Sequence, residues 1–195
     1  MKISLFTIVI IIFLNACTGT FYVVRHADRL NDSADTPLSD LGLERARVLR
    51  DTLLNKGIDS IFVSTKLRTQ QTGQPLATAL RKTLQIYNSD TLVSFINRIS
   101  KIKKSILVVS HSEQIPLVIR GLCSQEIELI GSGDFDNMYV VTIKKIGLEE
   151  QQKRLELHVM GELHHDLKCY LIKKLVIFSH FNPLKKCLNC LNFQT

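Results

Sequence analysis

The sequence lacks internal repeats of about 20–50 residues, low-complexity tracts and any dense basic run interleaved with aromatic residues. These absences exclude solenoid and low-complexity architectures. The most apolar stretch, Ile3 to Leu14, is shorter than the roughly 20 residues with which a helix crosses a bilayer. What is present is a chain of 195 residues, 45% hydrophobic and 22% charged. This length and composition fit one globular domain.

The formal net charge of +7 favours anionic partners such as phosphate esters, nucleic acids or an acidic membrane surface. The Lys and Arg residues are, however, scattered among Asp and Glu. Nucleic-acid binding needs a basic patch or stripe. We therefore expect no nucleic-acid partner.

The N-terminus has the features of an export signal. Met1-Lys2 gives a short positive region, and the apolar stretch Ile3 to Leu14 follows it. Leu14-Asn15-Ala16-Cys17 resembles a bacterial lipobox, which makes residues 1–16 a signal peptide and Cys17 the lipidated first residue of the mature chain. An uncleaved anchor and an ordinary secretory signal are the alternatives. All three place the domain outside the cytoplasm, and the first anchors it to the cell envelope.

Strands alternate with helices along the rest of the chain. β-branched or apolar runs predict strands at 20–24, 58–64, 84–87, 106–109, 138–143 and 155–159. Helical spacing of apolar residues predicts helices at 41–56, 67–80, 91–103 and 115–122. Ser39 or Asp40 can cap the first helix, and Pro75 can kink the second. This alternation indicates an α/β sandwich with a mostly parallel sheet, the two late strands forming a hairpin at its edge.

Polar residues follow three of these strands directly. They are Arg25-His26, Ser64-Thr65 with Arg68 one turn later, and Ser110-His111. Ligands in such folds bind beyond the carboxyl ends of the strands, so these side chains can converge. Two arginines and two histidines in one place would repel one another unless an anion lay among them. Phosphate fits, because a guanidinium group matches its oxygens bidentately.

The chemistry of these side chains suggests their roles. Nearby positive charge lowers the pKa of His26, which keeps its imidazole neutral and nucleophilic. Arg25, Arg68 and His111 then neutralise the oxygens of the transferred phosphoryl group. His26 becomes a phosphohistidine that water hydrolyses. We expect no metal and no cofactor, since these cationic groups do what magnesium does elsewhere.

Four blocks of sequence resemble the histidine phosphatase superfamily, which has the phosphoglycerate mutase-like fold. They occur in the family's order, and they read Arg25-His26-Ala27, Pro37 to Gly42 with Ala46, Ser64 to Thr72, and Val109 to Ser112. The short chain is similar to the small SixA-like branch. The resemblance implies a three-layer α/β/α sandwich over residues 17–161, with His26 as phosphoacceptor and Arg25, Arg68 and His111 as the phosphate pocket.

The general acid is not marked by a clear motif. Many members of the family use a carboxyl group to protonate the leaving oxygen. Asp28, Asp90 and Glu113 are the candidates here, and we assign Asp28. Without an acid, the enzyme would favour substrates with good leaving groups. The large insertions that build substrate caps in longer relatives are absent, so the sequence does not specify the substrate.

Residues 162–195 form a basic tail that does not match the family. Cys187-x-x-Cys190 has the spacing of zinc ligands, but it is a single pair without histidines in a matching register. A disulfide, an unstructured tail and a translated frameshift are the other interpretations. Cys123, near the end of an apolar helix, is expected to be a small core residue.

The sequence therefore predicts a metal-independent phosphomonoesterase, anchored by a lipid in the cell envelope. Its substrate would be a phosphorylated small molecule, or a phosphohistidine or other phosphorylated protein. A phosphoglycerate mutase-type phosphotransferase is one alternative, although glycolytic substrates are cytoplasmic. A lipoprotein that binds phosphorylated ligands without turnover is another, because fold does not determine function.

Overall fold

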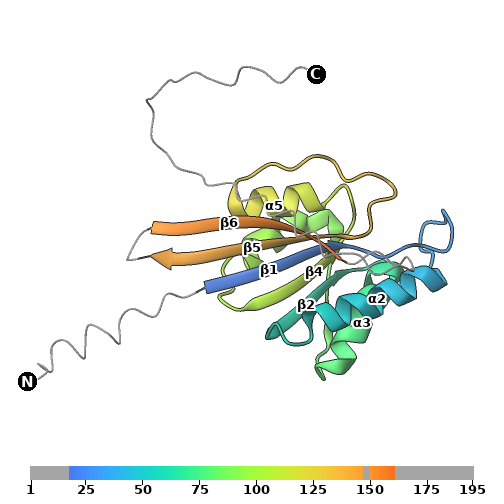
Figure 1. The fold of residues 1–195 in the computed structure, drawn as a ribbon. Coiled ribbons are helices and arrows are strands. Elements are labelled where there is room, and N and C mark those ends of the chain that lie inside the picture. The colour runs from blue at the N-terminus through green and yellow to red at the C-terminus, as the bar shows by residue number, and fades with distance from the viewer. Residues whose placement is uncertain (1–17, 147–149, 161–195) are drawn as a thin grey trace, which may run out of the picture.

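The computed structural model describes residues 18–146 and 150–160. The elements in chain order are β1 (Thr18–Arg25), α2 (Asp40–Leu53), β2 (Ile58–Ser64), α3 (Leu67–Ala79), β3 (Leu84–Tyr87), the 3-10 turn η1 (Ser89–Thr91), α4 (Leu92–Ile99), β4 (Ser105–Ser110), α5 (Ile115–Cys123), β5 (Asn137–Ile146) and β6 (Glu150–Val159) (Figure 1). The predicted signal peptide, Cys17, and the tail with Cys187 and Cys190 lie outside the described residues.

The strands form one sheet in the order β3-β2-β4-β1-β5-β6. The pairs β3–β2, β2–β4 and β4–β1 are parallel, while β1–β5 and β5–β6 are antiparallel. The prediction of a mostly parallel sheet with a late hairpin at its edge is confirmed. Because β1 and β4 are central neighbours, Arg25 lies opposite Ser110 at their carboxyl ends.

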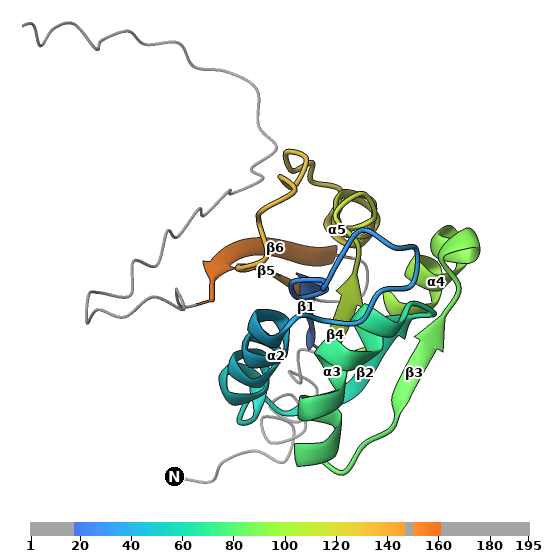
Figure 2. The same cartoon turned by 90° about the vertical axis from the view of Figure 1, so that its right-hand side faces the viewer.

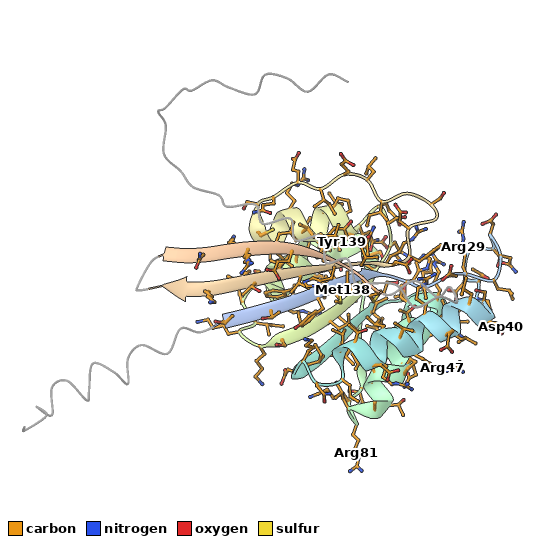
Figure 3. The ribbon with its side chains drawn as sticks, in the orientation of Figure 1. Arg29, Asp40, Arg47, Arg81, Met138 and Tyr139 are labelled. Carbon is orange, nitrogen blue, oxygen red and sulfur yellow. The ribbon has the colours of Figure 1, made fainter. Side chains whose placement is uncertain are left out.

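Helices cover both faces of the sheet, α2 and α3 on one side and α4 and α5 on the other (Figure 2). Successive strand residues supply the two faces, since side chains alternate along a strand. On β5, Met138 packs in the cluster with α2 and α3, and Tyr139 packs in the cluster with α4 and α5 (Figure 3). The predicted three-layer α/β/α sandwich is therefore confirmed. Burial on both faces explains why the central strands read as continuous apolar runs.

Two helix boundaries differ from the sequence prediction. Helix α4 ends at Ile99 instead of Lys103, and a 3-10 turn precedes it. Helix α2 ends at Leu53, and the chain turns through Gly57 with a φ of +64° before β2. Helix α3 continues through Pro75. These differences leave the carboxyl ends of the strands where the prediction placed them.

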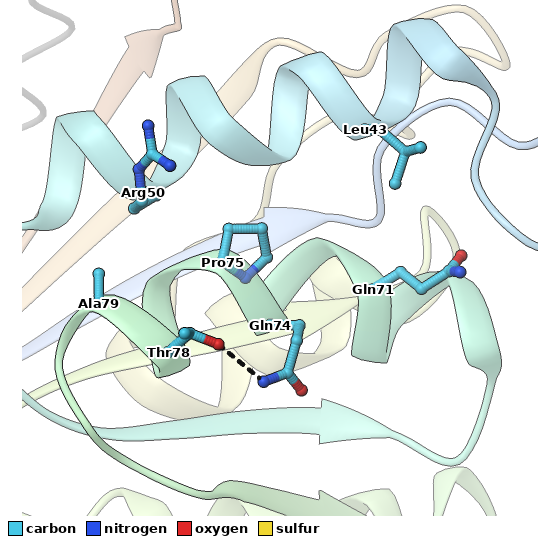
Figure 4. A pocket seen from close by; sticks show the side chains of 7 residues that line it. All are labelled: Leu43, Arg50, Gln71, Gln74, Pro75, Thr78 and Ala79. Carbon is cyan, nitrogen blue, oxygen red and sulfur yellow. Dashed lines mark hydrogen bonds between the residues drawn. The ribbon is translucent and has the colours of Figure 1, made fainter.

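A shallow hollow separates the outer surfaces of α2 and α3. Its lining includes Leu43, Arg50 and Pro75, and the Gln74 side chain donates a 3.1 Å hydrogen bond to Thr78 there (Figure 4). None of the predicted site residues lines it. No helix among residues 18–146 and 150–160 is long and apolar enough to cross a membrane.

Candidate active site

The structure brings the four predicted cationic residues together beyond the carboxyl ends of the central strands. The His26 and His111 rings lie 5.4 Å apart, centroid to centroid, in an edge-on arrangement. The His26 amide donates to the Ser110 carbonyl at 2.9 Å, which extends the β1–β4 ladder by one residue. Both imidazoles are nearly inaccessible, with 4% exposure for His26 and 5% for His111. The convergence expected from strand ends is thus present.

The His26 ring has a defined tautomer. Its Nδ1 lies 2.8 Å from the Ala27 carbonyl oxygen, which can only accept, so Nδ1 carries the proton. In the neutral ring Nε2 then has the free lone pair. Burial is the main cause that lowers the pKa of His26 to about 4, and the charges of Arg68, His111 and Arg25 contribute in the same direction, whereas the hydrogen bond to Ala27 acts against them. Near neutral pH the ring is therefore an unprotonated nucleophile.

The His111 ring is bonded on both sides by side chains. Its Nε2 lies 2.9 Å from the Ser64 hydroxyl, and its Nδ1 lies 3.4 Å from Nη2 of Arg68. Burial lowers the pKa of His111 to about 4, and Arg68 is the largest charge acting in the same direction. The site therefore contains two neutral histidines beside two arginines.

Arg25 is oriented by the loop between α5 and β5. Its Nη1 donates to the carbonyls of Gly131 at 2.8 Å and Ser132 at 3.0 Å. Its Cζ lies 4.2 Å from the centre of the Phe135 ring, a cation–π contact. Phe135 also lies 6.0 Å from the His26 ring, centroid to centroid. This loop therefore forms one wall of the site.

Arg68 approaches from the first turn of α3. Its Nη1 donates to the Ala34 carbonyl at 3.1 Å, and its Nη2 faces His111. The Nε groups of both Arg68 and Arg25 are buried and have no hydrogen-bond partner among the described residues. Burial is the main cause that lowers the pKa of each guanidinium. Unpartnered cationic donors are costly in a protein interior, so an anion is the ligand that suits this place.

The segment after His26 is fixed by the other motif residues. The Ser39 hydroxyl caps α2 by accepting from the Gly42 amide at 3.1 Å. Gly42 packs so closely on the chain that a Cβ there would overlap the Asp28 carbonyl. Thr72 on α3 accepts a 3.0 Å bond from the Ala27 amide. The second sequence block and Thr72 of the third thus support the loop that follows the nucleophile.

The three candidate acids lie in different surroundings. Asp28 accepts from Arg45 at 2.7 Å, and Arg45 also pairs with Asp136, so this carboxylate faces a guanidinium. Asp90 is exposed in η1. Glu113 is exposed too, but its charge acts on Arg25, Arg68 and His111. The assignment of Asp28 as the acid stays a prediction.

Sequence reasoning missed several residues that shape the site. Phe135 and the carbonyls of the Gly131 loop follow no strand and carry no periodic pattern. Ser64 marked a strand end, but its bond to His111 was not foreseen. No group of three or more His, Cys, Asp or Glu that could bind a metal occurs within the described ranges. Cys123 is buried, and its thiol donates to the Ile119 carbonyl at 3.2 Å, which confirms its place in the core.

Comparison with known proteins connects this geometry to one superfamily. The family model "Histidine phosphatase superfamily (branch 1)" matches residues 21–93, which include His26 and Arg68. The fold is similar to that of the solved structure of the protein histidine phosphatase SixA. The chain has the histidine phosphatase fold. A search of curated proteins found no significant match.

Three solved structures illustrate how this histidine phosphatase fold compares. The protein histidine phosphatase SixA, complexed with tungstate, is 19% identical, with a TM-score of 0.51 over 64% of this chain and 86% of that chain. Mycobacterial hydrolase 2 is 12% identical, with a TM-score of 0.57 over 71% and 89%. A mycobacterial glucosyl-3-phosphoglycerate phosphatase is 11% identical, with a TM-score of 0.54 over 65% and 91%. At these identities the likeness concerns the fold.

Proposed function

We propose that the protein is a phosphomonoesterase of the histidine phosphatase type and that it works through a phosphohistidine on His26. The observation that carries the proposal is the pair of buried, unpartnered Nε groups of Arg25 and Arg68 beside two neutral histidines. Such donors suit the oxygens of a phosphoryl group. The unprotonated Nε2 of His26 is the group able to attack its phosphorus.

The reaction then has two steps. Nε2 of His26 forms a bond to phosphorus while the bond to the leaving oxygen breaks, and the alcohol departs. Water next attacks the phosphohistidine, which releases inorganic phosphate and restores the neutral ring. Arg25, Arg68 and His111 stabilise the charge on the phosphoryl oxygens in both steps, so the reaction needs no metal.

The substrate we propose is a phosphorylated small molecule or a phosphorylated protein, phosphohistidine included. The fold neighbours include a protein histidine phosphatase and a glucosyl-3-phosphoglycerate phosphatase, which supports a phosphorylated protein and a phosphorylated small molecule as substrate classes. The mutase alternative would require isomerisation to outrun hydrolysis, and comparing the two rates on a phosphoglycerate decides it.

The deciding experiment measures hydrolysis of p-nitrophenyl phosphate by the full-length chain, purified in detergent, in the presence of EDTA. We expect turnover in EDTA and its loss by at least about 1,000-fold in His26→Ala. Arg47→Gln, which removes an exposed cation paired with Glu44, is the matched control and should keep wild-type activity. Phosphate binding without turnover in the folded protein would instead favour the phosphate-binding lipoprotein.

We also propose that the domain is anchored in the cell envelope by a lipid on Cys17. The lipobox-like sequence supports this, and β1 starts at the very next residue. Labelled fatty acid should be incorporated into the wild-type chain and not into Cys17→Ser. Equal labelling of both chains would contradict the proposed anchor.

A further inference from the structure

A chain of hydroxyl groups runs from His111 to the backbone of the β2–α3 turn. Oγ1 of Thr69 lies 2.7 Å from the Lys66 carbonyl and 3.1 Å from the Ser64 carbonyl, and both oxygens can only accept. The single hydroxyl proton of Thr69 is therefore used on the backbone. Oγ of Ser64 lies 2.9 Å from Oγ1 of Thr69, so Ser64 must be the donor in that contact.

This direction of donation determines the tautomer of His111. Since the Ser64 proton points to Thr69, the Ser64 oxygen can only accept from Nε2 of His111, which must be protonated. The other side of the ring leads to the same result, because Arg68 can only donate and Nδ1 faces its Nη2. Two independent contacts thus leave the lone pair on Nδ1, the nitrogen that faces the cationic site.

We propose that Ser64 and Thr69 are positioning residues that keep His111 in this tautomer, so that Nδ1 takes up a proton when a phosphate ester binds and returns it to the leaving oxygen. The inference rests on the proposed function and extends it. It assigns the role of general acid to a histidine, while Asp28 faces Arg45 in an ion pair.

The reason for proton uptake is electrostatic. A lone pair on Nδ1 would face the negative oxygens of a bound phosphate, whereas an N–H there would donate to them. Burial is the main factor that disfavours the imidazolium in the ligand-free site; Arg68, Lys66 and Arg25 act in the same direction, whereas Glu113 favours it and His26 is neutral. A phosphate dianion adds two negative charges at close range, which reverses this balance.

The step balances in atoms and charge. The ester binds as a dianion with one proton from solvent, or as a monoanion that passes its own proton to Nδ1. Nε2 of His26 bonds to phosphorus, the bond from phosphorus to the leaving oxygen breaks, and the Nδ1 proton moves to that oxygen. His111 is then neutral and can accept a proton from the water that hydrolyses the phosphohistidine.

The tautomer is tested directly by ¹⁵N NMR of the histidine rings in the ligand-free full-length protein. We expect Nε2–H for His111 in the wild type and in Thr69→Ser, which keeps the hydroxyl. Thr69→Val, of similar shape without the hydroxyl, and Ser64→Ala each remove the hydroxyl contact, so the Nδ1–H population should rise above that of the wild type, opposed only by the remaining contact with Arg68. Ser60→Ala, on the same strand but bonded to Asp59, is the matched control and should match the wild type.

Proton uptake is tested in a His26→Asn background, where phenyl phosphate binds without turnover. Calorimetry at about pH 7 in buffers of different ionisation enthalpy should show uptake approaching one proton per ligand, since most of the ester is a dianion there. Adding His111→Asn, which leaves an amide donor near the position of Nδ1, should abolish the uptake.

Leaving-group dependence tests the return of the proton. In His111→Asn we expect kcat/KM for phenyl phosphate to fall about 100-fold, and that for p-nitrophenyl phosphate, which leaves more easily, to fall several-fold less. An Nδ1–H tautomer in the free wild type, or ligand binding without proton uptake, would overturn the inference. So would a selective loss for phenyl phosphate in Glu113→Gln but not in His111→Asn. Correct tautomer and uptake without any turnover would support the positioning role and contradict the phosphatase proposal.

Discussion

The two halves of the site are built differently although each contains one arginine and one histidine. At the end of β1, backbone carbonyls orient both side chains: Ala27 for His26, and Gly131 with Ser132 for Arg25. Beyond β4 and β2, side chains orient His111, through the Ser64 hydroxyl and the Arg68 guanidinium.

This difference has a consequence for how each half responds to mutation. A backbone carbonyl acceptor is kept in every substitution of the residue that carries it. The tautomer of His26 therefore does not depend on the side chain of Ala27. The tautomer of His111 depends on three side chains, the hydroxyl groups of Ser64 and Thr69 and the guanidinium of Arg68, each of which a single substitution removes. Side-chain substitutions are therefore expected to change the tautomer of His111 more readily than that of His26.

The largest expected effect concerns the one property that the halves share, a neutral buried histidine. Each ring has its pKa lowered from 6.5 to about 4 on folding. Between these values the unfolded chain binds more protons, so the free energy of unfolding falls as pH drops from 6.5 towards 4. The loss approaches about 3 kcal/mol per histidine. Urea unfolding at several pH values should show that His26→Asn and His111→Asn each remove about half of the combined loss from the two histidines. No difference from the wild type would contradict the burial of these rings.

The second expected effect separates the two arginines. Arg25→Met and Arg68→Met should each lower kcat/KM for p-nitrophenyl phosphate by about 100-fold, because each removes a donor to the phosphoryl group. Arg25→Met should also lower the free energy of unfolding by about 2 kcal/mol, since two loop carbonyls lose a charged donor. Arg68→Met should lower stability less, since only one carbonyl, the exposed one of Ala34, loses a charged donor. Equal losses of stability for the two variants in urea unfolding would contradict the proposed difference between the two halves of the site.

The smallest expected effect concerns the aromatic wall of the nucleophile half. Phe135→Leu removes the ring over Arg25 and should weaken binding of inorganic phosphate about 3-fold, in line with about 0.5–1 kcal/mol for a cation–π contact. Phe135→Tyr keeps the ring and should bind phosphate as the wild type does. Titration calorimetry at neutral pH measures both, and identical affinities of all three chains would exclude a role for the ring.

Much of the fold, together with the two arginines and two histidines of the site, could be predicted because both follow from the local pattern of apolar and polar residues. Continuous apolar runs specify buried parallel strands, and the carboxyl ends of such strands meet at one edge of the sheet. Arg25 and His26 end one run, and Ser110 and His111 end another. Position in the chain was therefore sufficient to place these side chains together.

The partners of these residues could not be predicted because they come from distant, irregular segments. The Gly131 carbonyl that orients Arg25 lies 106 residues after it in the sequence, in a loop without a periodic pattern of apolar residues. Asp28 could be proposed as an acid, but its ion pair with Arg45 depends on how α2 is docked. The end of α4 was also predicted too late, since Ile102 continues the helical spacing of apolar residues past Ile99 without extending the helix.

The direction of β1 has a further consequence at the membrane. The strand begins at Thr18, next to the proposed lipid attachment, and its 8 residues end at Arg25, which His26 follows (Figure 1). At roughly 3.3 Å per residue, the strand separates the lipid from the nucleophile by about 26 Å. Under the proposed anchoring, the nucleophile lies at the opposite end of β1 from the lipid.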